Sequence, residues 1–303
     1  MEKFMSGIRK EMSGMKQWIR RAALGVLCML ALSAGARAED GIRLIIRGDD
    51  LGMTEGSLEA FEQAINNGVL TCASVLVPSP WFEGAAELCR KNPGWCVGIH
   101  LTLVGEWRGN RWRPVLPWDK VPSLVDENGY LYTYPKELYA HNPKLDEIEA
   151  ELRAQIELAK KKGITISYLD NHYLAVEKYP GGLDLLMKLG SEYNVPVSQY
   201  AGEQICRGIY DVPVDRKTMS AVEMLNELGP GLWLWYCHPG IESPEQNALI
   251  HTSPEDIFIE GGVGPHRAAV LKALMSIEVK SVILKKGIIL TDYREVWKER
   301  KKR

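Results

Sequence analysis

The chain has 303 residues, a formal net charge of −2 and 46% hydrophobic residues. This is the composition of an ordinary globular protein, with enough residues for one large domain or two small ones. Lysines and arginines are mostly interspersed with acids, so the sequence lacks the basic footprint of nucleic-acid-binding proteins and no nucleic-acid partner is expected. The sequence makes no prediction of the oligomeric state.

The N-terminal residues have the three parts of a secretory signal peptide. A basic segment at 16–21 precedes an apolar run at 22–35, and Ala-Arg-Ala at 36–38 matches the small-x-small cleavage pattern. The alternative is an uncleaved membrane anchor, but the apolar run is shorter than the about 20 residues that a membrane span needs. We predict a signal peptide at 1–38, a mature chain of 39–303 in the periplasm or outside the cell, and no stable membrane insertion after cleavage.

From residue 42 onward, strand-like runs alternate with helical patterns. Strand-like runs lie at 42–47, 71–78, 95–103, 164–173, 195–200, 231–240 and 287–293. Helical patterns lie at 54–68, 81–92, 145–163, 183–194, 220–229 and 266–287. This alternation indicates βαβ units in the α/β class with a parallel sheet. Its continuity favours a (β/α) barrel rather than an open doubly wound sheet, in a single domain that extends from 39 to 303. No GxGxxG follows a strand, which removes the easiest argument for a dinucleotide-binding fold.

Five cysteines remain after the predicted cleavage, without CxxC or zinc-type spacing. In an oxidising compartment Cys89 and Cys96 could form a disulfide, because a Pro-Gly turn separates them. The alternative is that they are buried free thiols.

A long aromatic-rich insertion at 104–143 interrupts the alternation after the third strand. It contains Trp107, Trp112, Trp118, Tyr130, Tyr132, Tyr134 and Tyr139, with Arg108, Arg111 and Arg113. Loops of this length in compact domains are usually functional or disordered, and the aromatic density argues against disorder.

Ionisable side chains stand at the carboxyl ends of four predicted strands. They are Asp49, Asp50, His100, Asp170, His172 and His238. In a (β/α) barrel these strand ends meet on one face. One carboxylate and two imidazoles make a facial set of ligands for a divalent ion, with open positions for water and substrate. One aspartate of the pair can bind the ion while its neighbour stays free to take a proton. The alternatives are that each histidine is an ordinary satisfied polar residue and that the paired aspartates form a helix-capping turn.

The other three histidines, His141, His251 and His266, lie outside the strand ends, and we predict that they are surface residues.

Four short segments, in this order, resemble the YdjC-like carbohydrate deacetylases. The segment 47–78 is similar to the family's opening strand, which ends in Asp-Asp-Phe/Leu-Gly before a helix and a second strand. "VGIHLTL" at 97–103 resembles its Gly-Leu-His-Leu-x-Leu stretch. "ISYLDNHY" at 166–173 resembles its Leu-Asp-Ser-His element, and "CHPG" at 237–240 its His-Pro-Gly. The resemblance extends from about residue 42 to 293, nearly the whole mature chain.

The resemblance implies a distorted, TIM-barrel-like (β/α) barrel of the glycoside hydrolase/deacetylase type. It also implies a metal-dependent hydrolase that removes N-acetyl groups from amino sugars in carbohydrates. By position, Asp50, His100 and His172 match the family's metal ligands. Asp49 matches the catalytic base, and His238 matches an active-site histidine.

The sequence departs from the family pattern at two positions. Leu174 and Ala175 follow Tyr173, where some members carry a second histidine. Many members also carry an arginine after the strand that corresponds to 195–200, but here no arginine follows before Arg207.

These residues lead to a hypothesis for the mechanism. One divalent ion is expected, zinc in the first place because of the two imidazoles and one carboxylate, with magnesium as the alternative. Asp49 takes a proton from water and His238 gives one to the leaving amine. Asp170 either orients the imidazole of His172 or has a capping role only.

The expected partner is an N-acetylated carbohydrate substrate. Aromatic faces stack on sugar rings, so we predict that Trp107, Trp112 and Arg111 of the insertion bind it. The alternative is that the insertion is a self-packed cap over the barrel.

Three rival functions belong to other classes. A glycoside hydrolase would use Asp49 and Asp170 as its two carboxylates and would not need His100 and His172 as ligands. A non-catalytic periplasmic carbohydrate-binding barrel protein would keep the aromatic residues without needing the base. Metal-dependent phosphoester hydrolysis would need a second cluster of metal ligands, which the sequence does not show.

Overall fold

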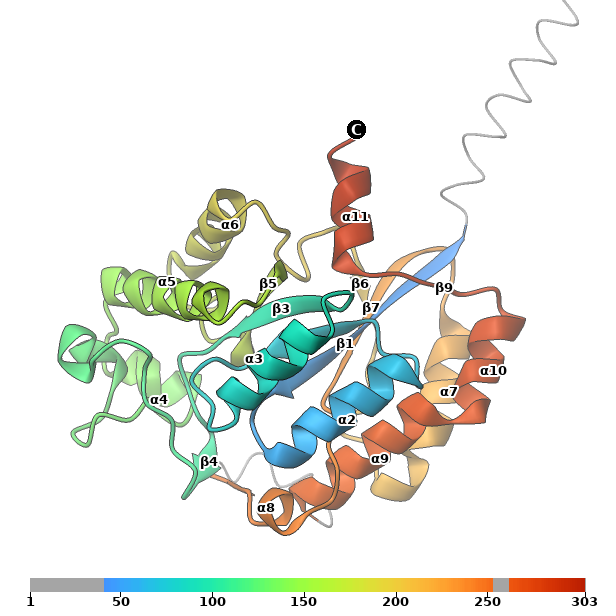
Figure 1. Cartoon of the computed structure of the whole chain (residues 1–303), viewed down its shortest axis with the longest axis horizontal. Coiled ribbons are helices and arrows are strands. Elements are labelled where there is room, and N and C mark those ends of the chain that lie inside the picture. The colour runs from blue at the N-terminus through green and yellow to red at the C-terminus, as the bar shows by residue number, and fades with distance from the viewer. Residues whose placement is uncertain (1–40, 253–261, 303) are drawn as a thin grey trace, which may run out of the picture. The chain divides into compact units, whose positions relative to one another are not determined.

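A parallel β-sheet lies at the centre of the described structure (Figure 1). The computed structural model describes residues 41–252 and 262–302, so the predicted signal peptide at 1–38 lies outside the described residues. The strands of the sheet are β1 (Ile42–Leu51), β2 (Cys72–Val75), β3 (Cys96–Leu101), β5 (Ile166–Asn171), β6 (Gln204–Ile205), β7 (Gly231–Cys237) and β9 (Ile289–Leu290). Their order is β5-β3-β2-β1-β7-β6, and β9 pairs with the start of β1. The predicted α/β class with a parallel sheet is confirmed.

Strand β1 lies in the middle of the sheet because its side chains are apolar on both faces. Leu44, Ile45 and Ile46 are fully buried, as expected for a parallel strand that is covered on both sides. β1 pairs with β7 from Ile42 to Gly48, and with β2 near its own carboxyl end. The carboxyl end of β1 therefore lies between those of its two neighbours.

The strand pairs among the described residues leave the sheet open, with β5 and β6 at its edges. The predicted strand at 195–200 is reduced to one bridge between Leu169 and Val197. Pro196 has no N–H to donate, and Gln199 turns the chain with a φ of 73°. Pairing therefore stops before it could close the sheet into a barrel.

Helices surround the sheet in the view of Figure 1. They are α2 (Glu55–Asn66), α3 (Phe82–Lys91), α4 (Pro135–Ala140), α5 (Leu145–Lys161), α6 (Gly182–Glu192), α7 (Lys217–Glu227), α8 (Pro244–Asn247), α9 (Val263–Met275), α10 (Ile277–Lys285) and α11 (Tyr293–Arg300). The single helix predicted at 266–287 is wrong: Ser276 is extended there and its side chain caps α10 by accepting from the N–H of Val279. Within the described ranges, no helix has the length and apolar character to cross a membrane.

The insertion at 104–143 is ordered around buried carboxylates of α5. It contains β4 (Trp107–Arg108), the 3₁₀ helices η1 (Trp118–Lys120) and η2 (Pro122–Leu124), and α4. Fully buried Glu151 accepts from the N–H groups of Val115 and Leu116 at 2.9 and 3.0 Å. β4 pairs antiparallel with β8 (Ile250–His251), which attaches the insertion to the segment that follows β7.

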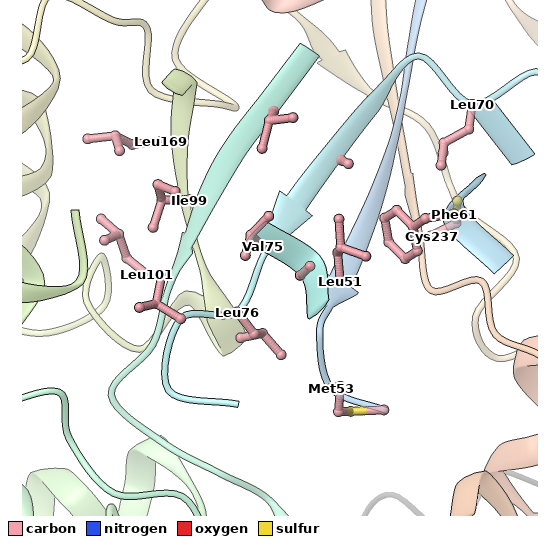
Figure 2. Close-up of a cluster of buried hydrophobic side chains, with 14 of the residues drawn as sticks. Leu51, Met53, Phe61, Leu70, Val75, Leu76, Ile99, Leu101, Leu169 and Cys237 are labelled. Atoms are coloured by element: carbon pink, nitrogen blue, oxygen red, sulfur yellow. The ribbon is translucent and has the colours of Figure 1, made fainter. Parts of the chain in front are cut away.

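Two apolar clusters cover the two faces of the sheet. The larger cluster fills the space between the sheet and the outer helices, and Figure 2 shows the part of it around Leu51, Phe61 and Ile99. Gly48 allows this packing because a Cβ there would lie 2.7 Å from the ring of Phe61. The smaller cluster includes Ile45 and, from α11, Tyr293.

The cysteines of the described residues are buried free thiols. Cys89 lies on α3, whereas Cys96 lies on β3 opposite Cys72 of β2. The structure therefore contains no disulfide between Cys89 and Cys96, in agreement with the alternative of free thiols.

Candidate metal centre

The carboxyl end of β1 turns sharply and carries the paired aspartates into one cavity. Successive strand residues normally point to opposite faces, but Asp50 has a φ of 73°, a left-handed conformation that is rare for residues other than glycine. Both Asp49 and Asp50 line the cavity as a result. Thr54 and Ser57 fix the turn by a reciprocal capping box at the start of α2.

Asp50, His100 and His172 come together as the sequence predicts. Asp50 Oδ1 lies 3.5 Å from His100 Nε2 and 3.6 Å from His172 Nδ1, and the two ring nitrogens are 3.2 Å apart. A metal ion with bonds of about 2.1 Å separates neighbouring ligand atoms by about 3.0 to 3.4 Å. All three residues are buried, and Asp50 Oδ1 has no hydrogen-bond partner in the described structure. The three donors fit one divalent ion.

Asp170 orients His100. Strands β3 and β5 place the two residues opposite one another, and His100 Nδ1 lies 2.9 Å from Asp170 Oδ2. A proton on Nδ1 would leave Nε2 free for a metal ion. Burial lowers the pKa of His100, but Asp170, followed by the paired aspartates, outweighs burial and raises the pKa to about 9. The predicted partnership between Asp170 and His172 is wrong because the strand register directs this carboxylate to His100.

A glutamate that the sequence analysis missed orients His172. His172 begins the 3₁₀ helix η3 (His172–Leu174), and its Nε2 lies 2.9 Å from Oε2 of buried Glu106. The backbone carbonyl of Glu106 accepts both the N–H and the hydroxyl of Thr252, at 2.9 and 3.0 Å. Glu106 is one of five acidic residues in the insertion at 104–143, and no sequence pattern distinguishes it from the others.

Arg267 holds the second oxygen of Asp50. This buried arginine of α9 donates from Nη2 to Asp50 Oδ2 at 2.6 Å. Burial raises the pKa of Asp50, but Arg267 and then the nearby histidines outweigh it and hold the pKa well below its usual range. Sequence reasoning missed Arg267 because nothing within the helical pattern at 266–287 marks it.

Arg47 fixes Asp49 by two hydrogen bonds. Its Nε and Nη2 donate to Oδ1 and Oδ2 of Asp49, each at 2.7 Å. Arg47 Nη1 also donates to Ser198 Oγ at 2.6 Å, and Nε lies 3.2 Å from Asp170 Oδ2. Arg47 and Asp49 share one strand face because they are two residues apart. An arginine of β1 therefore reaches Ser198 in the segment 195–200.

Asp49, His100 and Asp170 form a second group that is close enough to hold a metal ion. The guanidinium of Arg47 already contacts both of these carboxylates. Asp50 also contacts an arginine, Arg267, but Asp50, His100 and His172 all line the cavity, whereas Asp170 does not. The group with Asp50 is the better metal site.

His238 lines the same cavity, one residue after β7. Its Nδ1 has no hydrogen-bond partner within the described ranges. Burial lowers the pKa of His238 to about 4, although Asp50 acts in the opposite direction. The imidazole is therefore neutral near pH 7.

The cavity has a volume of about 410 Å³, within the range of small-molecule sites. Its aromatic lining residues are Tyr173, Tyr210 and Tyr236. His251, predicted at the surface, also lines it, and His266 is buried with 2% exposure. The surface prediction is wrong for His266, whereas His251 is half-buried and His141 is exposed as predicted.

The predicted substrate-binding residues of the insertion do not line this cavity. Trp107 and Trp112 are 0% and 2% exposed. The ring of Trp107 packs against Arg267, and that of Trp112 packs against His172. Arg111 donates to the carbonyl of Leu131 within the insertion. Their contact with substrate stays a prediction, and their burial fits the alternative of a self-packed cap.

The chain is similar to proteins of known families. The model of a family described as "YdjC-like protein" matches residues 43–285. A carbohydrate deacetylase of Enterococcus faecalis is 27% identical over 274 residues, which cover 84% of this chain and 98% of that protein. A carbohydrate deacetylase of Brevibacillus brevis is 35% identical over 156 residues, which cover 52% of this chain and 58% of that protein.

A solved structure from Enterococcus faecalis V583 is similar over most of its length. It is described as a proposed cellobiose-phosphate cleavage protein. It superposes with a TM-score of 0.68 at 25% sequence identity, and the match covers 84% of this chain and 99% of that one.

Proposed function

Since the chain belongs to the YdjC-like protein family, we propose that it is a metal-dependent carbohydrate deacetylase that removes N-acetyl groups from amino sugars. The observation that carries this proposal is the arrangement of Asp50, His100 and His172 around one point of a cavity, with Asp49 beside them. The names of the relatives from Enterococcus faecalis and Brevibacillus brevis support the same activity.

Each residue of the centre has a role in this proposal. A divalent ion held by Asp50, His100 and His172 supplies Lewis-acid polarisation of the acetyl carbonyl and of water. Zinc suits two imidazoles and one carboxylate, with magnesium as the alternative. Asp170 and Glu106 hold the two imidazoles in place.

Asp49 is the general base. Arg47 holds both of its oxygens, but each carboxylate oxygen has a second lone pair that can accept a proton from water. The arginine thus fixes the direction of the carboxylate without using up its basic positions.

His238 gives a proton to the leaving nitrogen. Because burial holds its pKa at about 4, the imidazole is neutral before the reaction. The proton that it would give to the departing amine is therefore the one that Asp49 takes from the attacking water. The same low pKa means that His238 carries this proton only transiently.

An acetate-release assay tests the proposed function. We expect the purified protein to release acetate from N-acetylated oligosaccharides, to lose this activity when a chelator removes its metal, and to regain it with added zinc. Free acetate and new reducing ends are measured on the same samples. New reducing ends without acetate, in the presence of chelator, would instead indicate a glycoside hydrolase.

The geometry does not support the glycoside hydrolase alternative. Oxygens of Asp49 and Asp170 lie within 4.8 Å of one another, and Arg47 contacts both carboxylates. The catalytic carboxylates of glycosidases are about 5 to 9.5 Å apart on either side of the sugar. Asp170 is also absent from the lining of the cavity.

We propose further that the open sheet is a distorted (β/α) barrel. Asn171 of β5 and Ile205 of β6 lie on the two edge strands, and yet both line the same cavity. This supports a sheet that is curved towards closure, and a mature domain that extends over 39–303.

For the N-terminus we propose export to the periplasm or the medium with removal of residues 1–38. The basic, apolar and small-x-small segments support it. N-terminal sequencing of the exported protein should begin at Glu39. A first residue at Met1 or Met15 in membrane-bound protein would contradict this proposal.

A further inference from the structure

Lys217 is a fully buried lysine outside the metal centre. It lies at the start of α7, and its Nζ donates to the carbonyls of Ile209 and Tyr210 at 2.8 and 3.0 Å. The third neighbour of Nζ is His266 Nε2 at 3.3 Å. Burying a charge is costly unless it is hydrogen-bonded. Here the three N–H groups of the ammonium are directed at two carbonyls of one loop and at one imidazole.

The loop that Lys217 holds carries Tyr210 into the cavity. The Tyr210 ring meets the His238 ring edge-on, with centroids 5.3 Å apart and an angle of 68° between the planes. It meets His266 in the same way at 5.0 Å and 66°. Tyr210 also lines the cavity. One aromatic ring therefore connects the buried lysine with the site.

His238 differs from the two imidazoles of the metal centre in how it is held. His100 and His172 are each within 2.9 Å of a carboxylate oxygen. In the part of the chain that the structure describes, Nδ1 of His238 has no such partner. The edge-on ring of Tyr210 is the contact that can fix the plane of His238.

We propose that Tyr210 is a positioning residue for His238, and that Lys217 acts on the site through Tyr210. This inference rests on the proposed function for the role of His238 as a proton donor. The arrangement of the three side chains is independent of that role. Lys217 anchors the backbone, the backbone places the ring, and the ring aligns the imidazole with the leaving nitrogen.

A double-mutant cycle tests the proposal. We expect Tyr210→Leu and Lys217→Met each to lower kcat for an N-acetylated sugar by about 10- to 100-fold, because small displacements of a catalytic group have effects of this size. The kcat of the double variant should be no lower than that of the less active single variant, because both changes remove the same contact. Tyr210→Phe keeps the ring and should retain most of the activity.

Tyr236 provides the matched control, because it lines the same cavity on β7. Tyr236→Leu combined with Lys217→Met should show additive losses. An aryl acetate, whose leaving group needs no proton, should be hydrolysed nearly as fast by Lys217→Met as by the unchanged protein. Additive losses for Lys217→Met and Tyr210→Leu, or equal losses on both substrates, would overturn the proposal.

NMR of histidine-labelled, zinc-loaded protein tests the placement without any activity measurement. Lys217→Met and Tyr210→Leu should shift the ring resonances of His238 in the same direction, while Tyr236→Leu leaves them in place. Unchanged His238 resonances in Lys217→Met would overturn the inference. Absence of acetate release by the unchanged protein would instead overturn the proposed function.

Discussion

Asp49→Asn is expected to lower kcat for acetate release by about 10²- to 10⁴-fold, the range that a general base contributes, while the bound metal stays at one ion per chain. The amide has nearly the same shape as the carboxylate but cannot accept a proton from water near neutral pH. Asp49 is not one of the three predicted metal ligands, so the metal content should not change. Steady-state kinetics and elemental analysis of the same preparation measure the two effects.

A control separates the loss of the base from a loss of the contacts that hold Arg47 in place. Ser198→Ala removes the hydroxyl that accepts from Arg47 Nη1 and keeps the carboxylate of Asp49. This variant should retain far more activity than Asp49→Asn. Full activity of Asp49→Asn would show that the base is another residue.

The second large effect is expected for His100→Ala, which should lose the metal ion and with it the activity. Its Nε2 is one of three donors, and an alanine leaves only two. Asp170→Asn keeps all three donors and removes only the charge that orients His100, so the metal affinity should fall by about 10- to 100-fold. Metal titration of apoprotein measures both variants.

His238→Ala is the control for this prediction. His238 lines the cavity but belongs to neither candidate group of metal ligands. It should therefore bind the ion as the unchanged protein does and lose turnover of N-acetylated sugars. A full complement of tightly bound metal in His100→Ala would contradict the assignment of the ligands.

Strand-end position predicts that six ionisable residues meet at one edge, and the resemblance to the YdjC-like family singles out three of them as metal ligands. Asp50, His100 and His172 lie at or just after the ends of β1, β3 and β5, and parallel strands bring their carboxyl ends to one edge. The α/β class and most helices follow from periodicity in the same way. The order of the strands across the sheet is harder to predict from the sequence. The segment 195–200 forms only one bridge, so the sheet stays open there, and the sequence pattern does not indicate this.

The residues that support the ligands could not be predicted, because they depend on side-chain packing between distant elements. Asp170 pairs with His100 through the register of β3 and β5, and not with its neighbour in sequence. Glu106 and Arg267 reach the site from the insertion and from α9. No local pattern marks such contacts.

The burial of the aromatic side chains in the insertion could not be predicted from the sequence either. The composition of 104–143 fits a sugar-binding surface and a packed cap equally well, because aromatic side chains serve both. The difference lies in α5, whose buried Glu151 holds the backbone of the insertion at Val115 and Leu116. The three tyrosines of the cavity come from other segments of the chain.

Anomalous diffraction at the zinc edge, from crystals of the zinc-loaded protein, tests the central claim most directly. We expect one strong peak, bonded to Asp50 Oδ1, His100 Nε2 and His172 Nδ1 at about 2.0 to 2.2 Å. A peak between Asp49 and Asp170, or no peak in this cavity in fully loaded protein, would contradict the assignment.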